Sequence, residues 1–142
     1  MDGARPPWRQ VSACAAVTRA DVEQALGQRV AEGEEQTDGT ASTCDYTGRR
    51  GQVTITVQRL TAELDLATEI ESLERTIPES SVRYAPGFRG TAFFLDIAGA
   101  GTQLYIVRGD RNYLLVSVLG FGEAARVSRA AERMARKALG RL

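Results

Sequence analysis

Residues 91–119 read TAFFLDIAGAGTQLYIVRGDRNYLLVSVL and contain three apolar runs separated by two short glycine-containing turns. The runs cover residues 91–97, 103–108 and 113–119. Gly99, Gly101 and Gly109 can supply the positive φ values that tight hairpins require. The sequence therefore predicts three consecutive antiparallel strands in the second half of the chain.

Two further strands are expected upstream, over residues 44–47 and 52–60. In the second of them Val53, Ile55 and Val57 alternate with polar residues, as in a strand with one wet face. Residues 31–42 are acidic and glycine-containing, and residues 79–89 lack a clear period, so both stretches are expected to be loops.

Three helices complete the predicted fold. The first begins at Thr18, which can form a capping box with Asp21, and ends at Gly27. The second covers about 63–77 and stops before a proline, and the third runs from about Gly122 to the C-terminus. The fold class is therefore α+β, with an antiparallel sheet of about five strands flanked by helices in the order α-β-β-α-β-β-β-α.

Length and composition indicate one folded domain. The chain has 142 residues, of which 43% are hydrophobic and 25% charged, values typical of globular proteins. We expect residues 1–10 to be a proline-containing linker and residues 11–142 to be a single domain. A membrane is expected as a partner only through an anchor upstream of this linker, because no apolar run is long enough to cross a bilayer.

The titratable residues exclude several function classes. The 18 basic and 18 acidic residues balance, which argues against nucleic acid as a partner. The chain has no histidine, so it cannot contain a Ser-His or Cys-His nucleophile or an imidazole metal site. No metal and no cofactor is expected.

Cys14 and Cys44 are the two cysteines, and they lie 30 residues apart without a Cys-x-x-Cys pair. They can form one structural disulfide, a redox pair, or two separate buried thiols. We favour the disulfide, which would join the entrance of the first helix to the sheet and indicate an oxidising compartment outside the cytoplasm.

Asp96 is the most plausible catalytic carboxylate. It alternates with Phe94 in its strand, so we expect it on the less buried face. Inside a pocket a carboxylate with a raised pKa could act as a general base. No second matching residue accompanies it, so the main prediction remains a protein that is not an enzyme.

The last two predicted helices carry opposite charge. The final helix carries Arg126, Arg129, Arg133, Arg136, Lys137 and Arg141, and the preceding one carries Glu63, Asp65, Glu69, Glu71 and Glu74. The basic stripe could contact an anionic surface such as lipid headgroups, the two helices could attract each other across one sheet face, or each could be a solvated helix face.

Two tyrosines are the remaining binding candidates. Tyr105 and Tyr113 belong to neighbouring predicted strands and could form an aromatic recognition surface. Together with Arg126, Arg129 and Arg133 they are the proposed binding residues; none is assigned a catalytic role.

The chain also resembles the small extracytoplasmic domains of bacterial cell-envelope lipoproteins, an uncharacterised and mostly actinobacterial type of family. The resemblance is carried by residues 13–27 (ACAAVTRADVEQALG), 44–46 (CDY), 53–57 (VTITV), 86–88 (PGF), 104–110 (LYIVRGD), 114–118 (LLVSV) and the alanine-rich C-terminal helix. It implies paired cysteines, a helix-flanked antiparallel sheet, a location in the cell envelope and no transferred catalytic residues.

These observations favour a non-enzymatic extracytoplasmic domain, in the cell envelope, periplasm or medium, that binds a partner protein or a small ligand. One alternative is a small pocket enzyme or small-molecule binder that uses Asp96. Another is a secreted protein inhibitor, which would need an exposed apolar patch or aromatic anchors.

Overall fold

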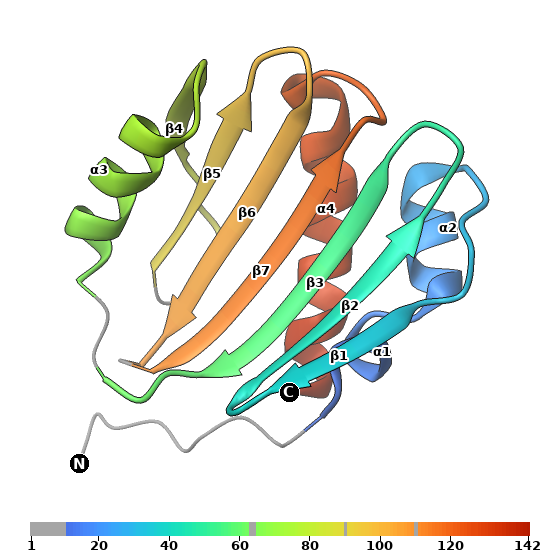
Figure 1. The fold of residues 1–142 in the computed structure, drawn as a ribbon, viewed down its shortest axis with the longest axis horizontal. Helices are drawn as coiled ribbons and strands as arrows, with labels where there is room; N and C mark the ends of the chain where they lie inside the picture. The colour runs from blue at the N-terminus through green and yellow to red at the C-terminus, as the bar shows by residue number, and fades with distance from the viewer. Residues whose placement is uncertain (1–10, 63–64, 90, 110) are drawn as a thin grey trace.

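The computed structural model describes residues 11–62, 65–89, 91–109 and 111–142. It is an α+β fold with a seven-stranded antiparallel sheet and four helices in this part of the chain (Figure 1). The helices are α1 (Ala13–Ala16), α2 (Arg19–Leu26), α3 (Leu66–Thr76) and α4 (Ala124–Arg141). The strands are β1 (Glu34–Asp38), β2 (Ala41–Thr47), β3 (Gln52–Arg59), β4 (Ser80–Tyr84), β5 (Thr91–Ile97), β6 (Gly101–Arg108) and β7 (Asn112–Leu119).

The fold class is confirmed, but the expected five strands and the expected element order are wrong. The acidic stretch 31–42 forms β1 and the start of β2, and the stretch 79–89 contains β4. Both added strands, β1 and β4, are sheet edges, where one side of the backbone has no partner strand and few side chains are buried. Their sequences therefore lack the apolar alternation by which strands are recognised.

The sheet consists of two meanders, β1-β2-β3 and β4-β5-β6-β7, which meet where β3 pairs with β7. The strand order is consequently β1-β2-β3-β7-β6-β5-β4. Ile55 lies opposite Val116 in the joining pair, so the seam runs through the centre of the core. The predicted antiparallel pairing of the last three strands is confirmed.

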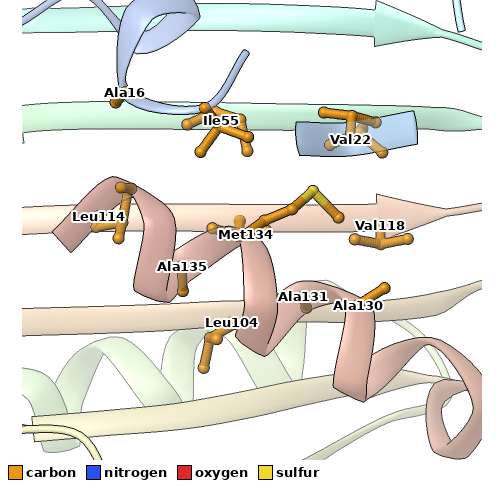
Figure 2. Close-up of a cluster of buried hydrophobic side chains, with 14 of the residues drawn as sticks. Ala16, Val22, Ile55, Leu104, Leu114, Val118, Ala130, Ala131, Met134 and Ala135 are labelled. Atoms are coloured by element: carbon orange, nitrogen blue, oxygen red, sulfur yellow. The ribbon is translucent and has the colours of Figure 1, made fainter. Parts of the chain in front are cut away.

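One face of the sheet is covered by α1, α2 and α4 and holds the main core. Figure 2 shows Met134 and Ala131 of α4 in one cluster with Ile55, Leu104 and Leu114 of the sheet. The alanines of α4 allow its backbone to lie close to the strands, as the small residues in the sequence indicate.

Among the described residues, the other face is covered by α3 alone, at the β4 end. A second cluster forms there from Phe93, Leu95 and Tyr105 of the sheet, with Ile70, Leu73 and Ile77 of α3 packed against it. The acidic α3 and the basic α4 thus lie on opposite faces (Figure 1), so the hypothesis that they attract each other on one face is wrong. Within the described ranges, no helix combines the length and apolar character needed to cross a membrane.

Candidate functional site

Cys14 and Cys44 form the expected disulfide, with Cα atoms 5.1 Å apart. Cys14 lies inside α1, whose N-cap is Ser12, and Cys44 is buried in β2. The Tyr46 hydroxyl donates hydrogen bonds to the carbonyl oxygens of Val17 and Cys14. The disulfide and Tyr46 therefore both fix α1 and its C-cap residue Val17 to β2.

Asp96 does not occupy the position expected for a general base. It shares the α4-covered face with Phe94, and its carboxylate accepts hydrogen bonds from the Arg83 guanidinium at 2.8 and 3.1 Å. The hydrogen bonds from Arg83 lower the pKa of Asp96, burial opposes that change, and the Thr102 hydroxyl adds to the lowering. The carboxylate is thus a stabilised anion, and the expectations of an exposed face and a raised pKa are both wrong.

The predicted neighbourhood of Tyr105 and Tyr113 is confirmed, with ring centroids 6.3 Å apart on β6 and β7. Tyr105 is only 5% exposed, stacks on Phe93 at 4.9 Å and donates a hydrogen bond to Gln103 at 2.8 Å. Burial, together with the charge of Glu69, raises the pKa of Tyr105 to about 12. The phenol stays protonated at neutral pH and lies beneath α3.

A cavity of about 380 Å³ opens where the β1–β2 hairpin meets the ends of β3 and β7. Its lining includes Val11, Ser12, Thr37, Gly39, Thr40, Ala41, Ser42, Val57, Gln58, Arg59 and Asn112. The Arg59 guanidinium donates to the Asn112 amide oxygen at 3.2 Å, which places one cation among hydroxyl and apolar groups. We call this the hairpin cavity. Asp96 does not line it.

The exposed side of α4 carries five cations, which we call the α4 basic stripe: Arg126, Arg129, Arg133, Arg136 and Lys137. All five are exposed, and none forms an ion pair with another residue in the described part of the chain. Arg136 also donates to the Gly87 carbonyl oxygen at 3.4 Å and lies over the Phe88 ring at 4.3 Å. The stripe contains Arg126, Arg129 and Arg133, the three basic binding candidates.

The binding candidates are therefore not brought together. The two tyrosines lie under α3, whereas the three arginines lie on α4 across the sheet. Arg59 and Arg83 were not predicted from the sequence, because their partners are 53 and 13 residues away. Gly33 was not predicted either; a Cβ added there would collide with the sulfur of Cys44 and crowd that of Cys14. No local pattern could have revealed these distant pairings.

No protein family, curated protein or solved structure matches this chain.

Proposed function

We propose that this chain is a non-enzymatic extracytoplasmic domain that docks on anionic lipid headgroups through the α4 basic stripe. The observation that carries the proposal is the row of five exposed cations without ion-pair partners among the described residues. A solvated helix of ordinary composition mixes both signs. On the outer side of α4, Glu132 is the one acidic residue within the helix.

The geometry of the stripe suits a flat anionic surface. Positions 126, 129, 133, 136 and 137 follow the three- and four-residue spacing of one helix face. The 18 residues of α4 give a helix about 27 Å long. Several headgroups could therefore be contacted at once without bending the helix.

Because the positive and negative charges balance, binding to an anionic surface would depend on where the cations lie on the protein. The chain has 18 basic and 18 acidic residues, so there is no net attraction to an anionic surface. At physiological salt the Debye length is about 8 Å, so acidic groups across the sheet on α3 are largely screened from a surface at α4. Attraction to lipid would depend on which face approaches it.

The stripe would bind at the surface without inserting. The apolar residues of α4 point into the core. The exposed side of the helix, which carries the five cations, therefore offers no large apolar side chain to insert into lipid. A cation near an anionic leaflet contributes about 1 kcal/mol, so the five would supply about 5 kcal/mol at most. Such binding would orient a domain that is tethered by another signal, in keeping with the two-signal requirement for stable attachment.

The envelope location rests on two further observations. The Cys14–Cys44 disulfide weakly favours an oxidising compartment. The resemblance to envelope lipoprotein domains points to the same place and supplies no catalytic residues. Both agree with an extracytoplasmic binding domain.

Flotation with vesicles of phosphatidylcholine and phosphatidylglycerol tests the proposal. We expect the oxidised protein to float with anionic vesicles at 50 mM salt and to be released from them at about 0.5 M salt. It should not bind vesicles of pure phosphatidylcholine. The triple variant R126Q/R129Q/R133Q should bind about 100-fold more weakly, since three cations contribute about 3 kcal/mol.

The matched control is R49Q/R50Q/R75Q, which changes net charge equally but alters exposed arginines outside α4. It should bind as the unmodified protein does. Equal losses in both triple variants would mean that net charge and not the stripe controls binding, and no flotation at 50 mM salt would reject the proposal outright.

A small-molecule binder remains the second candidate because of the hairpin cavity. Its volume of about 380 Å³ is in the range of ligand sites, and Arg59 favours a ligand with a carboxylate or another anionic group. Saturation-transfer NMR with a panel of hydroxylated carboxylic acids and neutral sugars would test this. Ala41→Phe, which fills the cavity, should abolish any true signal.

A further inference from the structure

The two edges of the sheet differ in how they are protected from pairing with other strands. The β1 edge reads Glu34-Glu35-Gln36-Thr37-Asp38, and all five residues are exposed. Three carboxylates in five residues would lose hydration if any strand were added beside them, so this edge is protected by charge, as is common at sheet edges. The β4 edge, Ser80-Ser81-Val82-Arg83-Tyr84, has no carboxylate.

The one charge on β4 is already neutralised. The Arg83 guanidinium binds both Asp96 oxygens and donates to the Ser128 hydroxyl at 2.6 Å. It also lies over the Phe94 ring at 4.2 Å. Arg83 is therefore held on the α4 side of the sheet and does not guard the edge.

The outer backbone groups of β4 follow from its hydrogen-bond register with β5. The Ala85 amide donates to Ala92, and the Ala98 amide donates to the Glu79 carbonyl. Because bonded and non-bonded pairs alternate in an antiparallel ladder, Ser81 and Arg83 are also bonded to β5. The N–H and C=O groups of the alternate residues consequently point away from the sheet: Ser80, Val82 and Tyr84.

Tyr84 marks the same edge with an exposed aromatic ring. It is 72% exposed and is the only large hydrophobic side chain so exposed in the described part of the chain. Its neighbour on that face, Val82, packs into the cluster under α3. The ring thus extends an apolar surface from the covered part of the sheet to the open edge.

The side of α3 that faces this edge is acidic. Ile70 and Leu73 of α3 pack on the sheet, so Glu69 lies on one flank of the helix. Burial raises the pKa of Tyr105 and Tyr113, and the charge of Glu69 adds to it, in agreement with a flank that faces the tyrosines. At 100° per residue, Glu74 lies about 140° from Glu69 around the helix, and Glu71 about 160°. Both glutamates are exposed, and the helical positions put them on the flank opposite Glu69, toward the β4 edge.

We propose that the β4 edge binds an extended basic segment of a partner protein as an eighth strand. Main-chain hydrogen bonds to Ser80, Val82 and Tyr84 would hold the segment, as in other cases of strand addition. Its cationic side chains on the α3 side would meet Glu71 and Glu74. A second copy of this chain fits less well, because two-fold pairing at β4 would bring two acidic α3 helices side by side.

The test uses ¹⁵N-labelled oxidised protein and an acetylated, amidated Lys-Thr octapeptide of alternating sequence, with the Glu-Thr octapeptide as control. We expect the Lys-Thr peptide to shift the amide signals of β4 and α3 and the Glu-Thr peptide to shift none. Val82→Pro removes an outward N–H without breaking the β4–β5 ladder, and it should weaken binding at least tenfold. A melting curve checks that this variant folds.

Paired charge variants keep the test decisive if Val82→Pro unfolds. E71Q/E74Q should weaken binding about threefold to fivefold at low salt, as expected for two exposed ion pairs, whereas E69Q on the other flank should not change it. The proposal is rejected if the peptide shifts β1 in place of β4, if both peptides bind equally, or if neither binds. Reversible dimerisation that Val82→Pro abolishes would assign the edge to a second copy.

Discussion

At the scale of single residues, Asp21 joins the start of the chain to its end. Its carboxylate accepts hydrogen bonds from the Thr18 amide and hydroxyl, at 2.8 and 2.9 Å, and from the Arg141 guanidinium of α4. Burial raises the pKa of Asp21, but the bonds from Arg141 and Thr18 lower it more, to about 2. The ionised carboxylate is therefore part of the contact between α2 and α4.

This pKa predicts a specific loss of stability in acid. An unfolded aspartate has a pKa of about 3.9, so the folded protein binds its proton more weakly. The stabilisation is complete above about pH 5 and is lost as the pH falls through 2. For this partly exposed pair it amounts to about 1 to 2 kcal/mol. Urea unfolding at pH 5, 4, 3 and 2 should show that difference shrinking between the native chain and D21N. A difference independent of pH would contradict the assignment.

The disulfide gives a second prediction at this scale. Cys14 and Cys44 close a loop with a sequence separation of 30 residues. Loop-closure entropy assigns such a bridge about 3 to 4 kcal/mol, through restriction of the unfolded chain. C14S/C44S should therefore unfold at lower urea concentration with a larger m value, and the reduced native chain should match it. Equal midpoints for oxidised and reduced protein would show that the bridge adds no stability.

The structural role of a residue could be predicted where its hydrogen-bond partner is close in sequence. The Thr18–Asp21 capping box and the αL residue Gly27, with φ of 68°, follow from local chemistry and are confirmed. The role of Asp96 was mispredicted because it depends on Arg83, which lies on a strand that the sequence does not reveal. Electrostatic environment is set by tertiary contacts, which a local pattern does not contain.

At the scale of elements, α3 depends on one row of apolar contacts with the sheet. Leu73 packs against the cluster of Phe93, Leu95 and Tyr105, and the outer side of the helix is solvated. Leu73→Ala should cost about 1 to 2 kcal/mol, less than a fully buried leucine. Because α3 keeps the phenol buried, the same change should lower the pKa of Tyr105 from about 12 toward its usual value.

Absorbance titration at alkaline pH measures the tyrosine change directly. Ser72→Ala, on the exposed side of α3, is the control and should leave the titration curve unaltered. If Leu73→Ala also leaves it unaltered, α3 does not control access to Tyr105. That result would make Tyr105 and Tyr113 candidates for a binding surface again.

Elements were predictable in proportion to the apolar surface they bury. Strand β3 alternates buried valine and isoleucine with partly exposed threonine, and β5 has the bounds that its sequence predicts. Strand β1 buries no side chain, so the hydrophobic pattern of the sequence does not indicate that it pairs with β2. Edge strands are stabilised by backbone pairing with a strand that is already in place.

At the scale of the whole molecule, the two faces of the sheet differ in charge and in the helices that cover them. The α4 basic stripe lies on the main-core side, and the acidic α3 lies on the other side beside the β4 edge. A domain held on lipid by α4 would therefore turn α3 and the β4 edge away from the membrane. The two proposed surfaces can be used at the same time, because neither covers the other.

The strand order predicts how stability is distributed over the sheet. The seam between β3 and β7 joins parts of the chain about 60 residues apart and lies between the two meanders, with β6 next to it. We expect amides in the central strands β3, β7 and β6 to exchange only when the sheet as a whole opens, whereas β1 and β4 can detach as edges. Hydrogen exchange should thus be slowest around Ile55 and Val116 and fastest, among strands, in β1 and β4.

Reduction of the disulfide separates this explanation from simple solvent exposure. Cys44 ties β2 to α1, so reduction should accelerate exchange in β2 more than in β4, which lies at the far end of the sheet. Mass spectrometry of peptides from β2, β4 and β7 would measure all three rates in one sample. Protection of β1 as strong as that of β7, before reduction, would mean that the sheet opens as one unit and that the seam is not its most stable part.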